Sequence, residues 1–133
     1  MGLQASFVSV EIDDERAAAC AHLFAESPNV RVLHGDWHEV LPAEAPFDFL
    51  FFDGGGWKRS PPAQMRAESG KALELVAPRG IVAMDNLTPE HLWPADGPEW
   101  PDALRELWLG SDALVATEIL TTPDSSAIVA VKR

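Results

Sequence analysis

The chain is poor in basic residues and has a single cysteine, and each shortage excludes a class of function. Its 10 Lys and Arg residues are scattered among 21 Asp and Glu residues, and the net charge is −11. Binding to a phosphate backbone requires clustered cations, so we expect no nucleic-acid partner. Cys20 has no second cysteine to pair with, which excludes an internal disulfide and favours an intracellular protein.

Signals for membrane insertion and export are also missing. No apolar run approaches the ~20 residues of a membrane-spanning helix. Residues 1–6 lack the basic and apolar regions of a signal peptide. We therefore expect no membrane partner and a cytoplasmic location. A length of 133 residues, with 47% hydrophobic and 23% charged residues, is typical of one globular domain, here residues 1–133.

Three apolar runs that end on an acid are the most informative features present. They are Val8–Glu11, Phe47–Asp53 and Ile81–Asn86, the last of which closes on an Asp-Asn pair. Ligands of open α/β sheets bind outside the carboxyl ends of the strands, so acids at these positions are candidates for a site. An acid there can also serve only as a helix cap or turn residue. Three such endings in one short chain favour the ligand site.

Strand and helix patterns alternate along most of the chain. The connection 121–126 is too short for a parallel crossover, so the last two strands must form an antiparallel hairpin. We therefore predict an α/β fold with a Rossmann-like, mostly parallel sheet, helices on both of its faces and a C-terminal hairpin. The nearly continuous apolar run 47–52 predicts a strand covered on both faces. The expected strands are 7–12, 30–34, 47–52, 81–84, 114–120 and 127–131, and the expected helices are 15–26, 63–76 and 102–109.

The first helix carries clear local signals. Asp13 and Asp14 supply an N-cap and first-turn acids that favour the helix macrodipole. Helical spacing places Ala17, Cys20, Ala21 and Phe24 on one face, and we expect Cys20 to be buried. Residues 78–80, Pro-Arg-Gly, predict a turn before strand 81–84.

This order resembles the class I S-adenosylmethionine (SAM)-dependent methyltransferases from their second strand onward. In that family an acid at the end of the second strand binds both ribose hydroxyls of SAM, and the resemblance assigns this role to Glu11. An ionised carboxylate suits it because it accepts two hydrogen bonds. Residues 32–36, Val-Leu-His-Gly-Asp, are similar to the turn after the family's third strand. The resemblance makes Asp36 and the neighbouring Trp37 candidate contacts of the adenine.

A closer resemblance is to the cation-dependent, catechol-type O-methyltransferases. Asp53 and the pair Asp85-Asn86 are similar in type, order and strand position to the residues that hold Mg²⁺ in that branch, and Asp53 also borders the cofactor. Oxygen ligands suit this hard cation, which lowers the pKa of a bound hydroxyl. The branch also has a Trp-Lys pair after its fourth strand, which the resemblance matches to Trp57 and Lys58. They imply an adenine contact and a general base, although Gly54–Gly56 separate them from Asp53.

One part of the family pattern is missing from this sequence. Family members begin with a strand and a glycine-rich SAM loop, and residues 1–5 contain no such loop. Strand, loop and helix together need about 30 residues. Because the missing strand is central in the family, two strands would each lose a partner. We expect an N-terminally incomplete domain, an N-terminal strand that repacks into the gap, or a homo-oligomer that supplies the pairing. Each implies weak or no SAM binding by the chain alone.

The sequence therefore predicts a SAM-dependent, Mg²⁺-assisted O-methyltransferase that acts on a small hydroxylated aromatic substrate. Two alternatives stay open: a metal-independent methyltransferase of the same fold, and a non-catalytic domain that has lost cofactor binding. A nicotinamide dinucleotide-binding fold would require a G-x-G-x-x-G loop, which the sequence lacks.

Overall fold

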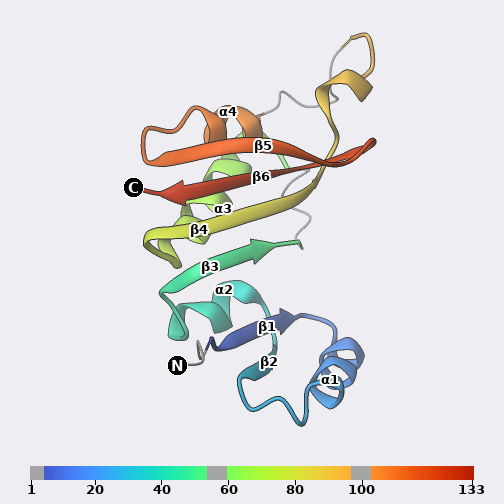
Figure 1. Ribbon diagram of the computed structural model, residues 1–133, viewed down its shortest axis with the longest axis vertical. Coiled ribbons are helices and arrows are strands. Elements are labelled where there is room, and N and C mark those ends of the chain that lie inside the picture. The colour runs from blue at the N-terminus through green and yellow to red at the C-terminus, as the bar shows by residue number, and fades with distance from the viewer. Residues whose placement is uncertain (1–4, 54–59, 97–102) are drawn as a thin grey trace. The chain divides into compact units, whose positions relative to one another are not determined.

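A computed structural model describes residues 5–53, 60–96 and 103–133 (Figure 1). The chain divides into two compact units, Met1–Glu44 and Ala45–Arg133. Strands and helices alternate along it, and the predicted α/β class with a closing antiparallel hairpin is confirmed. In the described ranges no helix combines the length and the apolar character that crossing a membrane requires.

The first unit is built around a two-stranded parallel sheet. Strands β1 and β2 pair in register from Phe7↔Val30 to Glu11↔His34. The predicted cap of the first helix is confirmed, because the Asp13 side chain accepts a hydrogen bond from the Arg16 backbone N–H at 2.9 Å. The elements of this unit are β1 (Phe7–Glu11), α1 (Asp14–Leu23), β2 (Val30–His34), α2 (Trp37–Val40) and a 3₁₀ helix at Leu41–Ala43.

Helix α1 is shorter and less buried than the sequence predicts. It ends at Leu23 rather than Glu26, and the Phe24 backbone N–H donates to the Cys20 carbonyl at 3.1 Å. Of its residues only Ala17 is buried, whereas Leu23 is 76% exposed. A two-stranded sheet offers a narrow surface, so it covers a single small position of the helix.

The second unit contains a mixed four-stranded sheet in the order β3-β4-β6-β5. Strands β3 and β4 are parallel, and β6 is antiparallel to both β4 and β5. Among the described residues β1 pairs only with β2, and β3 pairs only with β4. The elements are β3 (Phe47–Phe52), α3 (Pro62–Glu74), β4 (Val76–Leu87), a 3₁₀ helix (Glu90–Leu92), α4 (Ala103–Leu109), β5 (Leu114–Thr122) and β6 (Ser125–Lys132).

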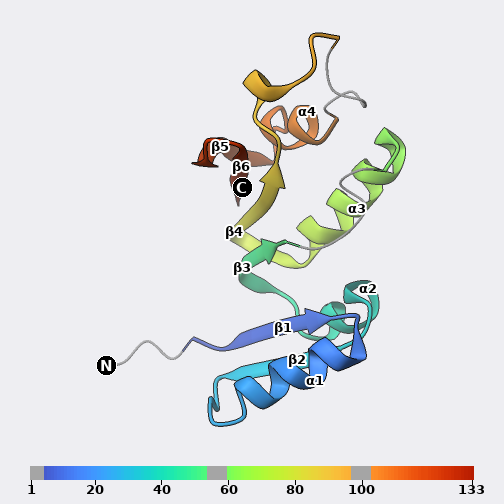
Figure 2. The same ribbon diagram turned by 90° about the vertical axis from the view of Figure 1, so that its right-hand side faces the viewer.

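The core of the second unit lies between this sheet and helices α3 and α4, which are on the same side of it (Figure 2). Val82 and Ile128 from the central strands are fully buried there. The Trp108 ring is 1% exposed, and its indole N–H donates to the Ser69 hydroxyl at 3.0 Å. The partner suits a buried indole, which needs an acceptor for its N–H.

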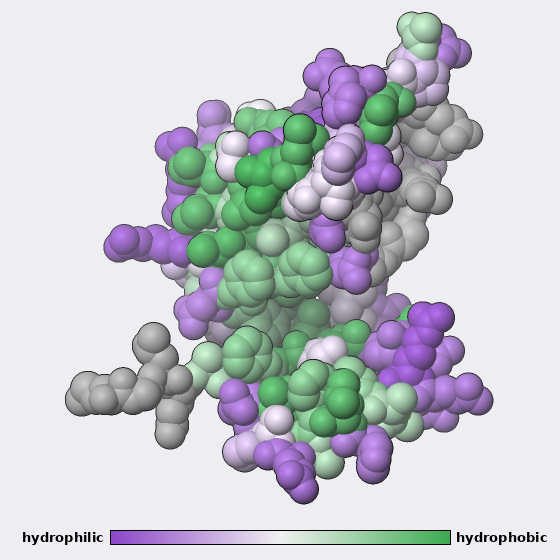
Figure 3. All heavy atoms as spheres, turned by 45° about the vertical axis from the view of Figure 1, so that its right-hand side comes forward, coloured by the Kyte–Doolittle hydropathy of each residue, from purple (hydrophilic) through white to green (hydrophobic). Residues whose placement is uncertain are grey.

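The opposite face of the four-stranded sheet carries exposed apolar side chains (Figure 3). Phe49 is 57% exposed, Phe51 54% and Val115 58%, while Leu50 and Phe52 on the helix side are buried. The prediction that strand 47–52 is covered on both faces is therefore wrong for the described residues. The run is continuous in sequence, but α3 and α4 pack against one face only.

Strand β4 is much longer than the predicted strand 81–84. It begins at Val76 and continues to Leu87, so that Asp85 and Asn86 are part of it. Arg79 has a φ of 67°, in the left-handed region, where the sequence predicts a turn. The strand continues past this irregular position because Phe47 pairs with Val76 and Phe49 pairs with Ile81.

Candidate functional site

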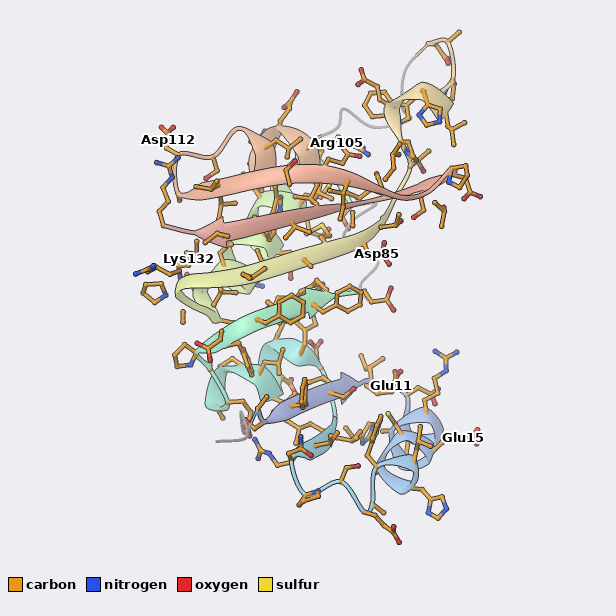
Figure 4. All side chains as sticks on the ribbon, viewed as in Figure 1. Glu11, Glu15, Asp85, Arg105, Asp112 and Lys132 are labelled. Atoms are coloured by element: carbon orange, nitrogen blue, oxygen red, sulfur yellow. The ribbon has the colours of Figure 1, made fainter. Side chains whose placement is uncertain are left out.

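Two aspartates follow matched positions of neighbouring parallel strands. The register of β3 and β4 pairs Phe51 with Ala83 and Phe52 with Met84. Asp53 directly follows β3, and Asp85 is the residue of β4 that follows Met84. Because paired strands are about 4.8 Å apart, these two positions lie side by side at the carboxyl edge of the sheet. Asp53 is exposed and Asp85 is partly buried; Figure 4 shows Asp85 near the carboxyl end of β4.

A β-bulge places Asp85 and Asn86 at this edge. Met84 pairs with Ile128 and Leu87 pairs with Ser126, so two residues of β4 stand opposite Ala127 alone. A bulge interrupts the alternation that sends successive side chains to opposite faces of a strand, and bulges are frequent beside active sites. The predicted strand 81–84 ends before this bulge. No local signal in the sequence indicates that the strand continues or that it bulges there.

The residue types at positions 53, 85 and 86, two Asp and one Asn, suit a hard divalent cation. Two carboxylates and an amide supply oxygen ligands, which Mg²⁺ prefers, and leave positions for water and substrate. Within residues 5–53, 60–96 and 103–133, no group of three His, Cys, Asp or Glu side chains is placed to hold a metal ion. Asp53 and Asp85 would thus be the only acidic ligands among the described residues.

The first unit brings Glu11 and the turn after β2 together. Glu11 ends β1 and pairs with His34, and the Gly35 N–H donates to the Glu11 carbonyl at 3.0 Å. Oε1 of Glu11 accepts a hydrogen bond from the Asp13 N–H at 3.0 Å. Asp36 follows Gly35 directly. The structure therefore places Glu11 and the Asp36 turn at the carboxyl edge of one small sheet, as the sequence predicts.

Asp36 and Trp37 make local contacts with His38. Oδ1 of Asp36 accepts hydrogen bonds from the His38 backbone N–H at 2.9 Å and from the His38 ring at 2.7 Å. The Trp37 ring stacks on the His38 ring with their centroids 3.8 Å apart. Asp36 is the N-cap of α2, and its adenine contact stays a prediction. The predicted Trp57 and Lys58 lie outside the described residues.

Sequence reasoning missed a polar cluster that we call the Arg105 cluster: Arg105 on α4, Glu118 on β5 and Ser126 on β6. Arg105 Nε donates to Glu118 Oε2 at 2.7 Å and Nη2 donates to Oε1 at 2.6 Å. The Ser126 hydroxyl donates to the same carboxylate. The hydrogen bonds from Arg105 lower the pKa of Glu118; burial opposes the shift, and the bond from Ser126 adds to it. The sequence did contain one signal for this cluster: Glu118 is a charged residue in phase with the inward-facing Leu114 and Ala116 of β5.

Acid is expected to destabilise the second unit through Glu118. The folded state lowers the pKa of this carboxyl, so its contribution to the free energy of unfolding is complete above the ordinary glutamate pKa. That contribution falls as the pH drops through the lowered value, because the unfolded chain binds the proton first. Urea denaturation between pH 7 and pH 3 would measure the decline, and Glu118→Gln should make it shallower. Asp112→Asn, at an exposed acid, is the control; an unchanged slope in Glu118→Gln would contradict the assignment.

Comparisons with known proteins support the fold. No protein-family model matches the chain, and no curated protein matches it. Cofactor-bound Rv0187 from MTB has a TM-score of 0.75 at 21% identity, over 99% of this chain and 63% of that one. The O-methyltransferase TomG from Streptomyces achromogenes, in complex with SAM, has a TM-score of 0.71 at 24% identity, over 100% and 65%.

The O-methyltransferase from Bacillus cereus in complex with SAH gives a TM-score of 0.69 at 22% identity, and the match covers 96% of this chain and 63% of that one. The chain thus spans less than two thirds of the length of these three structures. The TM-scores show a common fold, and at these identities they show the fold alone: the chain has the Rossmann-like α/β fold of these methyltransferase structures.

Proposed function

We propose that this protein is a SAM-dependent O-methyltransferase that transfers a methyl group to a hydroxyl of a small aromatic substrate with the help of Mg²⁺. Residues 1–133 would then form a single methyltransferase-like domain. The observation that carries the proposal is the placement of Asp85 and Asn86 in a bulge beside Asp53, at the carboxyl edge of parallel strands. Two similar structures, of O-methyltransferases in complex with SAM or SAH, also support it.

The proposed roles follow from what each side chain offers. Glu11 would accept hydrogen bonds from the ribose hydroxyls, and Asp36 and Trp37 would contact the adenine. Asp53 would border the cofactor and, with Asp85 and Asn86, would hold the cation. Lys58, outside the described residues, would accept the proton of the substrate hydroxyl.

The contribution of the chain would consist mainly of positioning and of moving one proton. When bound, SAM supplies an electrophilic methyl group, and the cation stabilises negative charge on the substrate oxygen. Asp53 and Asp85 would orient the substrate hydroxyl, which replaces a random encounter with an aligned one. Lys58 would take the hydroxyl proton as the oxygen–carbon bond forms and the sulfur–carbon bond breaks, leaving SAH and the methyl ether.

Glu11→Ala is expected to weaken SAM binding by about 10- to 100-fold, because a hydrogen bond to a charged group contributes about 1.5–3 kcal/mol. Calorimetry with SAM up to millimolar concentration would measure this loss. Glu15→Ala is the matched control, since Glu15 is an exposed acid in the first turn of α1. Equal affinities of Glu11→Ala and the natural protein would contradict the ribose role. A folded natural protein that gives no heat with SAM would instead favour the non-catalytic domain.

A metal-independent methyltransferase of this fold is the second candidate. Under this alternative Asp53, Asp85 and Asn86 serve only as turn residues. Equal rates of methyl transfer with and without a chelator would identify it.

A further inference from the structure

The Arg105 cluster is attached to the segment that leaves the carboxyl end of β4. Besides its two bonds to Glu118, Arg105 donates through Nη2 to the Thr88 carbonyl at 2.8 Å and to the Ser126 hydroxyl at 3.2 Å. The Ser126 hydroxyl lies 3.3 Å from the Leu87 carbonyl. The cluster thus contacts the two residues that follow the Asp85-Asn86 bulge.

Trp93 also connects the segment after β4 to the Arg105 cluster. Its indole N–H donates to the Thr88 carbonyl at 3.1 Å, so this carbonyl accepts from both Trp93 and Arg105. The Arg105 guanidinium also lies over the Trp93 ring, 5.3 Å from its centroid, a cation–π distance. Residues 87–93 are therefore held at their first two carbonyls and at the side chain of their last residue.

Burial strengthens the contacts within the cluster, whereas the two hydrogen bonds to the Thr88 carbonyl are exposed. The Arg105 side chain is 14% exposed and that of Glu118 is 25% exposed, while Ser126 is fully buried. Hydrogen bonds in such surroundings are stronger than in water, and an unmade bond is costly. The guanidinium is suited to this place because its planar fork meets the carboxylate with two bonds and its face stacks on an indole. An ammonium group supplies a charge without this fork.

We propose that Arg105 is a positioning residue: it holds residues 87–93 in place and thereby keeps the Asp85-Asn86 bulge in the arrangement that binds a divalent cation. The second half of this inference rests on the proposed function, whereas the first half concerns the chain alone. Arg105 would act through the backbone that follows the bulge and would touch neither cation nor substrate.

Hydrogen exchange and metal binding, measured on the same variants, test the two halves separately. In Arg105→Ala we expect exchange of the amides in 87–93 to accelerate at least about 10-fold, because the local opening loses its tethers. Affinity for Mg²⁺ alone, by calorimetry on the folded protein, should fall about 10- to 100-fold, as it does when supporting partners of metal ligands are removed. Arg66→Ala, at an exposed arginine on α3, should change neither quantity.

Arg105→Lys provides the second variant, in case Arg105→Ala does not fold. The lysine keeps a positive charge near Glu118 but loses the two parallel hydrogen bonds of the guanidinium to that carboxylate. Faster exchange of the amides in 87–93 is therefore still expected. Natural exchange rates in a folded Arg105→Lys would overturn the first half of the inference. A variant with lower stability, faster exchange and natural Mg²⁺ affinity would overturn the second. If the natural protein binds no Mg²⁺, the proposed metal site is wrong, and the exchange result alone decides the role of Arg105.

Discussion

Asp85→Ala is expected to reduce Mg²⁺-dependent methyl transfer by on the order of 100-fold or more, because even supporting residues of metal sites change activity by 10- to 100-fold. Asp85 and Asp53 are the acidic ligands of the proposed cation, so the variant would leave one carboxylate to hold a double charge. The measurement is transfer of labelled methyl from SAM to a 1,2-dihydroxybenzene, with Mg²⁺ and with a chelator. Chelation should lower the activity of the natural protein to a similar degree.

Asp48→Ala is the matched control for this experiment. Asp48 is an exposed acid on β3, near the opposite end of the strand from Asp53. Its removal changes the net charge of the protein by the same amount, and we expect activity and Mg²⁺ affinity to stay as they are. Natural activity in Asp85→Ala, or activity of the natural protein that is indifferent to the chelator, would rule out the metal site and leave the metal-independent enzyme.

Trp108→Ala is expected to destabilise the protein by about 3–5 kcal/mol, the usual cost of truncating a buried aromatic side chain. The ring is 1% exposed, and the variant would leave a cavity between α4, α3 and the sheet. It would also remove the donor of the bond to the Ser69 hydroxyl. A loss of this size is a large part of the 5–15 kcal/mol typical of a whole domain. Urea denaturation followed by circular dichroism would measure it.

Two further variants separate packing from hydrogen bonding at this position. Trp108→Phe keeps an aromatic ring but leaves the buried Ser69 hydroxyl without its indole donor, and we expect a loss of about 1–3 kcal/mol. Leu109→Ala, at a neighbouring residue that is 43% exposed, should cost less than either change at Trp108. A Trp108→Ala protein as stable as Leu109→Ala would contradict the placement of the ring in the core.

The predictions that succeeded depend on short stretches of sequence. The Asp13 cap follows from an acid placed before a helical pattern. The hairpin of β5 and β6 follows from a connection too short for a crossover. Predictions that failed required knowledge of the packing partner. The burial expected for α1 and for both faces of β3 depends on how much surface lies opposite, and local periodicity does not contain that information.

The candidate site also has parts that the sequence could indicate and parts that it could not. Glu11, Asp53 and Asp85 could be proposed from sequence because each ends or directly follows an apolar run, and Asp36 because its turn resembles that of a known family. The bulge could not be proposed, since it is a mismatch in register between β4 and β6. Arg105 was missed because its partners are Glu118, 13 residues away, and Ser126, 21 residues away. No spacing rule joins a helix to two later strands at such distances.

The amino-acid sequence by itself determined the order of strands and helices and put acids at the strand ends, since backbone preferences and hydrophobic alternation act over a few residues. Only the tertiary structure decided which strand ends become neighbours, where β4 bulges and that Arg105 holds the segment after it. These outcomes depend on strand register and on contacts between distant residues, which form when the separate elements compete for the same buried surface.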